Sequence, residues 1–271
     1  MTIALIDNGS LEPAAHRNLR AVAAGISEHT GETVEAVSWK HSDRIAAEAL
    51  DGVPAPTLGS WLRMRLRQGE RDFIFIPFFI SDQGAIGSAL RSDIEAIRLN
   101  DHRFSYAFTT GLSHEGTVTA IAAERIRSAA RGLTRPPVVV VDHGGPSRAS
   151  AALRDHIAQT LRTTLGDEVG PVAAASMESP EGEAYQFNRP LLSEVLSSPP
   201  FNHGKVVVAP LFLSPGRHAG PDGDLRQIAG AAEAASPGLA CHFADLIGSH
   251  SLAIETLAKA LRHTLPLPTI L

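Results

Sequence analysis

Cysteine is almost absent from this sequence of 271 residues, since Cys241 is the only one. A single cysteine excludes an intrachain disulfide, a Cys-x-x-Cys zinc site and an iron–sulfur cluster held by cysteines. Any metal ion must therefore be bound by histidines and carboxylates.

Long hydrophobic segments are missing as well. The longest uninterrupted apolar run, Phe73 to Ile80, contains a proline and is far shorter than the roughly 20 residues that span a bilayer. The first residues, up to Asp7, include no basic leader, no long apolar region and no small-residue cleavage site. We therefore expect no membrane span and a cytoplasmic location.

Lysine is scarce, occurring only as Lys40, Lys205 and Lys259, and the formal net charge is −5. This charge does not support a nucleic-acid partner. The sequence also has no Gly-x-x-x-x-Gly-Lys-Ser/Thr phosphate loop, no Gly-x-Gly-x-x-Gly after its first strand, no His-Glu-x-x-His and no Gly-x-Ser-x-Gly. Nucleotide-binding, zinc-protease and serine-esterase functions therefore lack their sequence signals.

The composition is that of a globular protein, with 44% hydrophobic and 20% charged residues. A tandem repeat divides the chain: residues 3–10 resemble 138–145, residues 73–81 resemble 206–214, and residues 111–114 resemble 247–250. The three matches occur in one order at nearly one offset, which predicts a duplication with its seam at 132–137. We expect two domains, 1–134 and 135–271, as the length also suggests.

Within each half, short apolar runs alternate with longer amphipathic stretches. Runs that are apolar throughout, such as Val138 to Val141, are typical of strands buried on both faces of a parallel sheet. We predict an α/β fold of two similar domains, each a parallel β-sheet flanked by helices, which face a shared cleft. The expected strands are 2–6, 33–38, 72–77, 104–108, 137–142, 170–175, 205–211 and 239–244, and the helices expected in the second half are 147–165, 186–197, 222–235 and 250–263.

Two histidines and a carboxylate follow three strands of the second half. His143 comes after the first of these strands, Glu178 after the second and His218 after the third. Ligands of open α/β sheets bind at the carboxyl ends of the strands, so these side chains are expected to converge. Together they could hold a divalent metal ion or perform acid–base chemistry. Glu181 and Glu183 are close enough in sequence to take the role of Glu178.

Glycines accompany both histidines. Gly144 and Gly145 follow His143, where they allow a tight turn and leave room for a flat ligand. His250, which precedes the last helix, is instead expected to make a structural hydrogen bond.

These motifs resemble those of the class II tetrapyrrole chelatases, specifically the sirohydrochlorin cobalt- and ferrochelatases. The resemblance spans about residues 137–263, nearly all of the second half. It rests on the strand ending in Asp142-His143-Gly144, on Glu178, on the segment 206–213 that leads into Gly216-Arg217-His218, and on Gly248-Ser249-His250.

The resemblance implies an enzyme, a lyase that inserts a divalent metal ion into a sirohydrochlorin-type tetrapyrrole in cobalamin or siroheme biosynthesis. It assigns metal binding and catalysis to His143, His218 and Glu178. Neutral imidazoles suit this task because they bind the ion without holding it too tightly and have pKa values close to neutrality. The metal is a substrate, cobalt or iron, with nickel or zinc possible in vitro, and no redox cofactor is expected.

The tetrapyrrole is the expected partner, with no nucleic acid and no membrane, and the protein is expected to be a monomer or a homodimer. Gly144, Gly145 and Arg217 are the expected contacts of the ring. Because the substrate is a polycarboxylate, Arg148 and Arg226 are further candidates for anchoring it.

The first half departs from the family pattern. Asn8 stands where the first histidine is expected, Ala85 aligns with His218, and Lys40 falls close to the position of Glu178. Asn8 cannot act as a base at neutral pH and Ala85 supplies no ligand. We therefore expect catalysis in the second half only.

Two other functions remain open. The chain could be a non-catalytic metal- or tetrapyrrole-binding protein with the same two-domain fold. It could also be a hydrolase that uses His143 and Glu178 on a metal-activated water.

Overall fold

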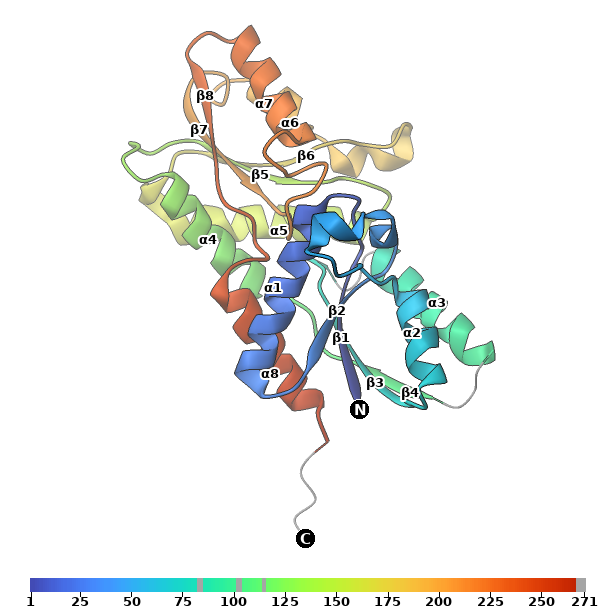
Figure 1. The fold of residues 1–271 in the computed structure, drawn as a ribbon. Helices are drawn as coiled ribbons and strands as arrows, with labels where there is room; N and C mark the ends of the chain where they lie inside the picture. Colours follow the sequence, from blue (N-terminus) through green and yellow to red (C-terminus); the bar gives the residue numbers. More distant parts are fainter. Residues whose placement is uncertain (82–84, 101–103, 114–115, 267–271) are drawn as a thin grey trace. The chain divides into compact units, whose positions relative to one another are not determined.

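The computed structural model describes residues 1–81, 85–100, 104–113 and 116–266 (Figure 1). The strands in these residues form two four-stranded sheets of orders β2-β1-β3-β4 and β6-β5-β7-β8, and every strand pair is parallel. The predicted α/β fold with two similar parallel sheets is confirmed, whereas the shared cleft stays a prediction. The strands are β1 (Thr2–Asp7), β2 (Val34–Ser38), β3 (Asp72–Pro77), β4 (Ser105–Phe108), β5 (Val138–Asp142), β6 (Val172–Ser176), β7 (Gly204–Pro210) and β8 (Leu239–Phe243).

Helices alternate with these strands along the chain. The α-helices are α1 (Pro13–Thr30), α2 (Leu58–Arg67), α3 (Ala85–Asn100), α4 (Thr117–Ala129), α5 (Arg148–Leu165), α6 (Leu192–Leu196), α7 (Asp224–Ala235) and α8 (Ser251–Thr264). Short 3₁₀ helices are η1 (Ser42–Arg44), η2 (Ala47–Leu50), η4 (Gly166–Glu168) and η5 (Glu183–Asn188). The predicted helices 147–165, 222–235 and 250–263 therefore lie within two residues of α5, α7 and α8.

The prediction of one helix over 186–197 is wrong. η5 ends at Asn188, and α6 begins only at Leu192. Pro190 lies between them, has no backbone N–H and disfavours helical backbone at Arg189. The segment therefore forms two short helical pieces instead of one.

The apolar strands supply the buried core of each sheet. Val138 to Val141 have no exposed surface at all, as expected for a strand covered on both faces. In the first sheet Trp61 of α2 packs edge-on against Phe73 and Phe75 of β3. No helix within the described residues is long and apolar enough to cross a membrane.

The chain divides into two compact units, each built on one sheet. Unit 1 contains β1 to β4 with α1, α2, α3 and α8, and unit 2 contains β5 to β8 with α4 to α7. Within unit 1, α8 packs against α1 (Figure 1), and Ile254 leaves so little space that a Cβ on Gly25 would lie 2.9 Å from its Cδ1. Within unit 2, α4 packs against α5 and β7. The predicted division at 134/135 follows the sequence repeat, whereas the compact units assign α4 to the second sheet and α8 to the first.

The sequence repeat has its structural counterpart in the matching strand orders of the two sheets. His114, which aligned with His250 in that repeat, lies outside the described residues, as does the side chain of Ala85.

Candidate functional site

The turn after β5 brings His143 next to the loop that follows β6. Gly144 has a φ of +84°, and a Cβ on it would lie 1.9 Å from the carbonyl oxygen of Glu178, so this turn requires glycine. The N–H of Met177 donates to the carbonyl of Asp142 (2.8 Å), and the N–H of Glu178 donates to that of His143 (3.1 Å). These bonds continue the β5–β6 pairing and place Glu178 beside His143.

Gly145 is held in place by a buried side chain. Asn188, which is 1% exposed, donates from Nδ2 to the carbonyl of Gly145 (2.9 Å) and accepts its N–H through Oδ1 (3.3 Å). A Cβ added to Gly145 would meet no atom within 4 Å. The backbone of this turn is therefore fixed from one side and open where a side chain would project.

The loop between β7 and α7 orients His218. Its Nδ1 lies 2.6 Å from Oδ2 of Asp224, the first residue of α7. An ionised carboxylate can only accept, so Nδ1 carries the hydrogen and donates it. The N–H of Leu225 also donates to the carbonyl of His218 (3.1 Å). His218 is thus tied to the start of α7 through its ring and through its backbone.

The rings of His143 and His218 meet at their Nε2 atoms, which are 3.3 Å apart, with the ring planes 82° from each other. Nδ1 of His143 lies 2.9 Å from the carbonyl oxygen of Gly144, so it also donates its hydrogen. With its hydrogen on Nδ1, each ring can direct an Nε2 lone pair toward the other, an arrangement that favours a cation between them. Two nitrogens bound to one tetrahedral metal ion at about 2.05 Å are separated by about 3.3 Å.

Glu178 lies at the margin of this pair. Its Oε1 is 3.7 Å from Nε2 of His143, and 59% of its side chain is exposed. Among the residues that the structure describes, no three His, Cys, Asp or Glu side chains are arranged as a complete metal-binding group. The site thus offers two converging nitrogens and a nearby carboxylate.

A buried polar network supports the turn from beneath. Ser176 donates to Oδ1 of Asp142 (2.7 Å), and Arg154, only 2% exposed, contacts Ser176 and lies 3.4 Å from the same carboxylate oxygen. Arg154 also donates to the backbone carbonyl of Phe187 (3.1 Å). Burial raises the pKa of Asp142, while Ser176 and Arg154 act in the opposite direction. The network holds the end of β5, and with it His143, in one position.

The predicted arginine contacts lie on the same loops and helices. Arg217 has 80% of its side chain exposed, and its Nε is 3.9 Å from Oδ2 of Asp224. Arg148 lies over the ring of Phe187, and Arg226 lies over the ring of Phe243. Of the three arginines, Arg217 is therefore the one joined to a group that contacts a site histidine.

The structure distinguishes Glu178 from the two alternative glutamates. Glu178 is within ion-pair distance of His143, whereas Glu181 and Glu183 are exposed residues before and at the start of η5. His250 makes the structural contact expected of it, since its Nε2 lies 3.1 Å from Oε2 of Glu124 on α4.

Sequence reasoning missed three supporting residues. Asp224 had a usable signal, because an acidic residue at a predicted helix start lies one loop away from His218. Arg154 had another, since it interrupts an apolar stripe on α5 whose other members are buried. Asn188 had none, because its role depends on the path of the chain between β6 and α6.

Unit 1 has the same turn with other side chains. A Cβ on Gly9 would lie 1.7 Å from the carbonyl oxygen of Lys40, and the N–H of Lys40 donates to the carbonyl of Asn8 (3.2 Å). These contacts match those of Gly144, Glu178 and His143. Asn8 and Lys40 therefore occupy the positions of a histidine and a glutamate, so unit 1 lacks this part of the metal-binding arrangement.

Comparisons with known proteins agree with this description. Residues 137–264 match the CbiX family model. SirB from Bacillus subtilis with Fe³⁺ is 14% identical, with 97% of this chain and 96% of that chain covered and a TM-score of 0.69. The sirohydrochlorin chelatase SirB from Bacillus subtilis subspecies spizizenii in complex with cobalt is 15% identical, with 99% and 97% covered and a TM-score of 0.67. No curated protein matches the sequence.

At these identities the likeness to the SirB structures shows a shared fold. The family model adds a match in sequence, and it covers the half that contains His143, Glu178 and His218. The resemblance predicted from the motifs is confirmed in the second half of this chain, which matches the CbiX family model.

Proposed function

We propose that this chain is a chelatase that inserts a divalent metal ion, cobalt or iron, into a sirohydrochlorin-type tetrapyrrole. The observation that carries the proposal is the pair of Nε2 atoms of His143 and His218, 3.3 Å apart, in rings whose Nδ1 atoms each face a hydrogen-bond acceptor. The CbiX match supports the reaction class, and the SirB structures with Fe³⁺ and with cobalt support these two metals.

His143 and His218 are the proposed ligands of the incoming ion, with Glu178 as an additional ligand or base. Two imidazoles and one peripheral carboxylate bind a divalent ion less tightly than a complete set of protein ligands does. The ring nitrogens of the substrate can therefore take the ion over. Asp224 accepts the Nδ1 hydrogen of His218, which fixes the ring orientation and keeps Nε2 available.

Insertion exchanges one metal dication for two pyrrole protons. Two N–H bonds break, the electron pairs stay on the nitrogens, and these pairs form the bonds to the metal. As the ion leaves the protein, Nε2 of His143 or His218 becomes able to accept a proton. Glu178, 3.7 Å from Nε2 of His143 and exposed, is placed to receive a proton and pass it to water.

The surroundings of the pair suit a flat anionic substrate. Gly144 and Gly145 leave the turn without side chains, and the exposed guanidinium of Arg217 can bind a carboxylate in bidentate fashion. Imidazole–carboxylate sites accept several first-row metals, so nickel or zinc insertion in vitro is expected too. Cobalt as the physiological metal assigns the reaction to cobalamin biosynthesis, and iron assigns it to siroheme biosynthesis.

The test is the absorbance change of sirohydrochlorin on addition of Co²⁺ or Fe²⁺, measured above the uncatalysed rate. The wild type should accelerate insertion, and His218→Ala should lose this acceleration. His203→Ala, which removes an exposed histidine of the same unit, is the matched control and should keep the wild-type rate.

Three results would contradict the proposal. Stoichiometric retention of metal or ring without turnover would instead identify a binding protein. A metal that stays bound through catalytic turnover of a hydrolysable substrate would identify a hydrolase. Unchanged insertion by His218→Ala would show that the chemistry occurs elsewhere in the chain.

A further inference from the structure

The peptide group between Gly144 and Gly145 joins the ring of His143 to a buried amide. Its carbonyl oxygen lies 2.9 Å from Nδ1 of His143. Its N–H, at the other end of the same planar group, donates to Oδ1 of Asn188 (3.3 Å). The C=O and the N–H of a trans peptide point in opposite directions, so the orientation of this one group decides what Nδ1 of His143 meets.

Neither residue that flanks this peptide has a side chain that opposes turning the peptide over. φ is +84° at Gly144 and +143° at Gly145, values that glycine adopts at little cost. A reversed peptide would direct its N–H, in place of its carbonyl, toward Nδ1 of His143. Nδ1 would then have to accept, and the ring hydrogen would have to be on Nε2.

The tautomer of His143 matters because of its neighbour. With its hydrogen on Nε2, His143 could donate to Nε2 of His218, which is 3.3 Å away. The two rings would then bond to each other, and both lone pairs needed for a metal ion would be occupied. The observed peptide orientation favours the other tautomer, because a carbonyl oxygen can only accept a hydrogen from Nδ1.

Asn188 holds the peptide in this orientation with a pair of hydrogen bonds, here called the Asn188 clamp. Nδ2 donates to the carbonyl of Gly145 (2.9 Å), which fixes the amide so that Oδ1 accepts the N–H of the same residue. Because Asn188 is 1% exposed, a reversed peptide would leave Oδ1 buried without this donor. Arg154 in turn holds the backbone here, since it donates to the carbonyl of Phe187 (3.1 Å).

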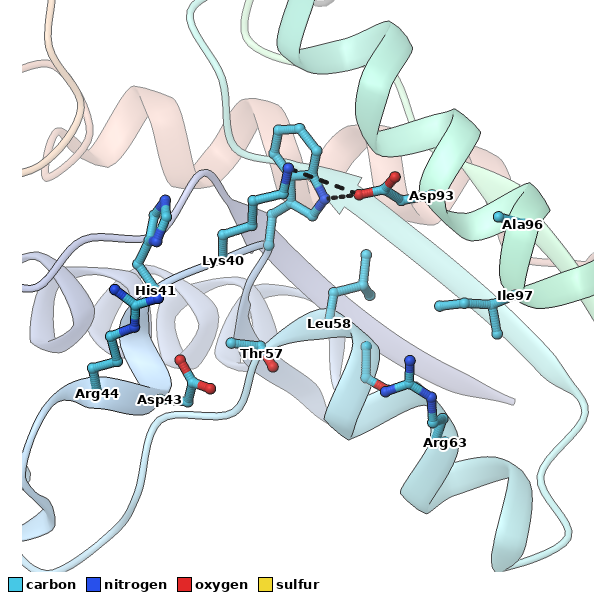
Figure 2. A pocket seen from close by; sticks show the side chains of 12 residues that line it. Lys40, His41, Asp43, Arg44, Thr57, Leu58, Arg63, Asp93, Ala96 and Ile97 are labelled. Carbon is cyan, nitrogen blue, oxygen red and sulfur yellow. Dashed lines mark hydrogen bonds and ion pairs between the residues drawn. The ribbon is translucent and has the colours of Figure 1, made fainter.

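Unit 1 has a clamp of the same kind at the equivalent turn. The N–H of Ser10, which aligns with Gly145, donates to Oγ of Ser42 (3.3 Å), and this hydroxyl donates to the carbonyl of Ser10 (3.2 Å). Ser42 is 1% exposed, and its neighbours His41 and Asp43 line a pocket of about 500 Å³ that Ser42 itself does not line (Figure 2). The clamp thus occurs in both units, and in unit 2 it acts on a peptide that also contacts a histidine ring.

We infer that Asn188 is a positioning residue for the metal-binding pair: by fixing the peptide between Gly144 and Gly145, it keeps the hydrogen of His143 on Nδ1 and the Nε2 lone pair available. The inference rests on the proposed function, in which His143 and His218 hold the incoming ion. The two histidines then have different supports. Asp224 sets the tautomer of His218 directly, whereas Asn188 sets that of His143 through the backbone of the turn.

The first test is the tautomer of His143 in the metal-free, full-length protein, from the ring ¹⁵N chemical shifts at about pH 8, where ordinary histidines are neutral. A ring nitrogen with its hydrogen and one without it have widely different shifts. The wild type should have the hydrogen on Nδ1, and Asn188→Ala should have a mixture of both tautomers. His218 is the internal reference, because Asp224 should keep its hydrogen on Nδ1 in both proteins. The signals absent from His143→Ala identify the ring of His143.

The second test is the affinity for Co²⁺, measured by isothermal titration calorimetry. Asn188→Ala should bind Co²⁺ about tenfold more weakly or worse, as expected when a metal-binding histidine loses an outer partner. Asn188→Leu should show the same loss although it keeps the buried volume, which separates the hydrogen bonds from packing. Gln186→Ala removes an exposed amide from η5 and is the matched control, with an affinity within twofold of wild type.

Val195→Ala controls for a general loss of stability, because it removes buried apolar volume from α6 of the same unit without contacting the turn. A loss of Co²⁺ affinity in Val195→Ala as large as that in Asn188→Leu would make the role of Asn188 merely structural and overturn the inference. An unchanged His143 tautomer in the Asn188 variants would overturn it too. If neither variant folds, as judged by circular dichroism, the wild type still decides, since a hydrogen on Nε2 of its His143 contradicts the inference.

The outcome is separate from that of the proposed function. A wild type that inserts no metal, but whose His143 tautomer and Co²⁺ affinity depend on Asn188, would reject the chelatase and retain the positioning role. Normal insertion by wild type and by Asn188→Ala, with the same His143 tautomer in both, would retain the chelatase and reject the positioning role.

Discussion

The turn after β1 and the turn after β5 have the same backbone and different side chains. Both require glycine, because a Cβ on Gly9 or Gly144 would lie under 2 Å from the carbonyl oxygen of the neighbouring loop. The side chains next to these glycines are Asn8 in unit 1 and His143 in unit 2. The comparison shows that the turn geometry is a property of the sheet edge, whereas metal-binding capacity depends on the few side chains placed on it.

The buried groups beneath the two turns also differ. In unit 2, Asp142 is paired with Ser176 and with the buried guanidinium of Arg154. In unit 1, Asp7 has hydrogen bonds from Ser38 and from the backbone of Gly9, and Ser38 also has a weak contact with His16 (3.4 Å). Oδ1 of Asp7 and Nε2 of His16 are buried without a partner among the described residues. Unit 2, which contains the proposed site, thus has the more completely paired support.

The largest effect is expected from truncating to alanine the side chain that distinguishes each turn. His143→Ala removes a proposed metal ligand and proton acceptor, so kcat for metal insertion should fall about a hundredfold or more. Asn8→Ala at the equivalent turn should stay within twofold of wild type. A comparable loss in both variants, measured by the absorbance of the ring, would show that the two turns share the chemistry.

Removing the buried cation of unit 2 tests the difference in support. Arg154→Met leaves the carboxylate of Asp142 buried without its positive partner, which should cost about 3 kcal/mol or more of unfolding free energy. His16→Met in unit 1 removes only a weak contact and should cost about 1 kcal/mol or less. Urea unfolding of both variants measures this contrast, and equal losses would contradict it.

A smaller effect is expected from the partner of His218. Asp224→Ala frees the Nδ1 hydrogen and the ring orientation, so Co²⁺ affinity and insertion rate should fall about 10- to 100-fold. Asp222→Ala removes an exposed carboxylate from the same loop and serves as the control. A twofold change or less in Asp224→Ala would show that the loop backbone alone positions His218.

The smallest effect concerns the pH dependence of unit 1. Burial raises the pKa of Asp7 from 3.8 to about 6, against the hydrogen bonds from Ser38 and Gly9. The folded state therefore binds this proton more tightly than the unfolded chain does. The resulting stabilisation is complete below about pH 4 and is lost as the pH rises through 6.

Asp7→Asn keeps a neutral side chain at every pH. It should therefore gain up to about 2 kcal/mol over wild type at pH 7.5 and nothing at pH 4. Burial and the charge of Arg20 lower the pKa of His16 to about 4. His16 therefore gives the stability the opposite pH dependence, and it does so equally in wild type and in Asp7→Asn. Urea unfolding at the two pH values, with the exposed Glu32→Gln as control, measures the difference. A pH-independent difference would contradict the assignment to Asp7.

The sequence alone determined the fold class, the strand positions and the convergence of His143, Glu178 and His218. Continuous apolar runs specify buried parallel strands, and the residues after such strands share one edge of the sheet. The internal repeat revealed the two similar sheets, and it exposed Asn8 and Lys40 as departures. Pro190 was also visible, although the prediction of a helix over 186–197 did not take it into account.

Only the tertiary structure decided which helices complete each sheet and how the site side chains are oriented. α4 joins the second sheet and α8 the first, because burial of a helix's apolar face depends on packing partners that lie far away in the sequence. The hydrogen bonds that leave both Nε2 atoms free come from Asp224 and from the carbonyl of Gly144. Their geometry depends on loop paths and ring orientations, which the amino-acid pattern does not encode locally.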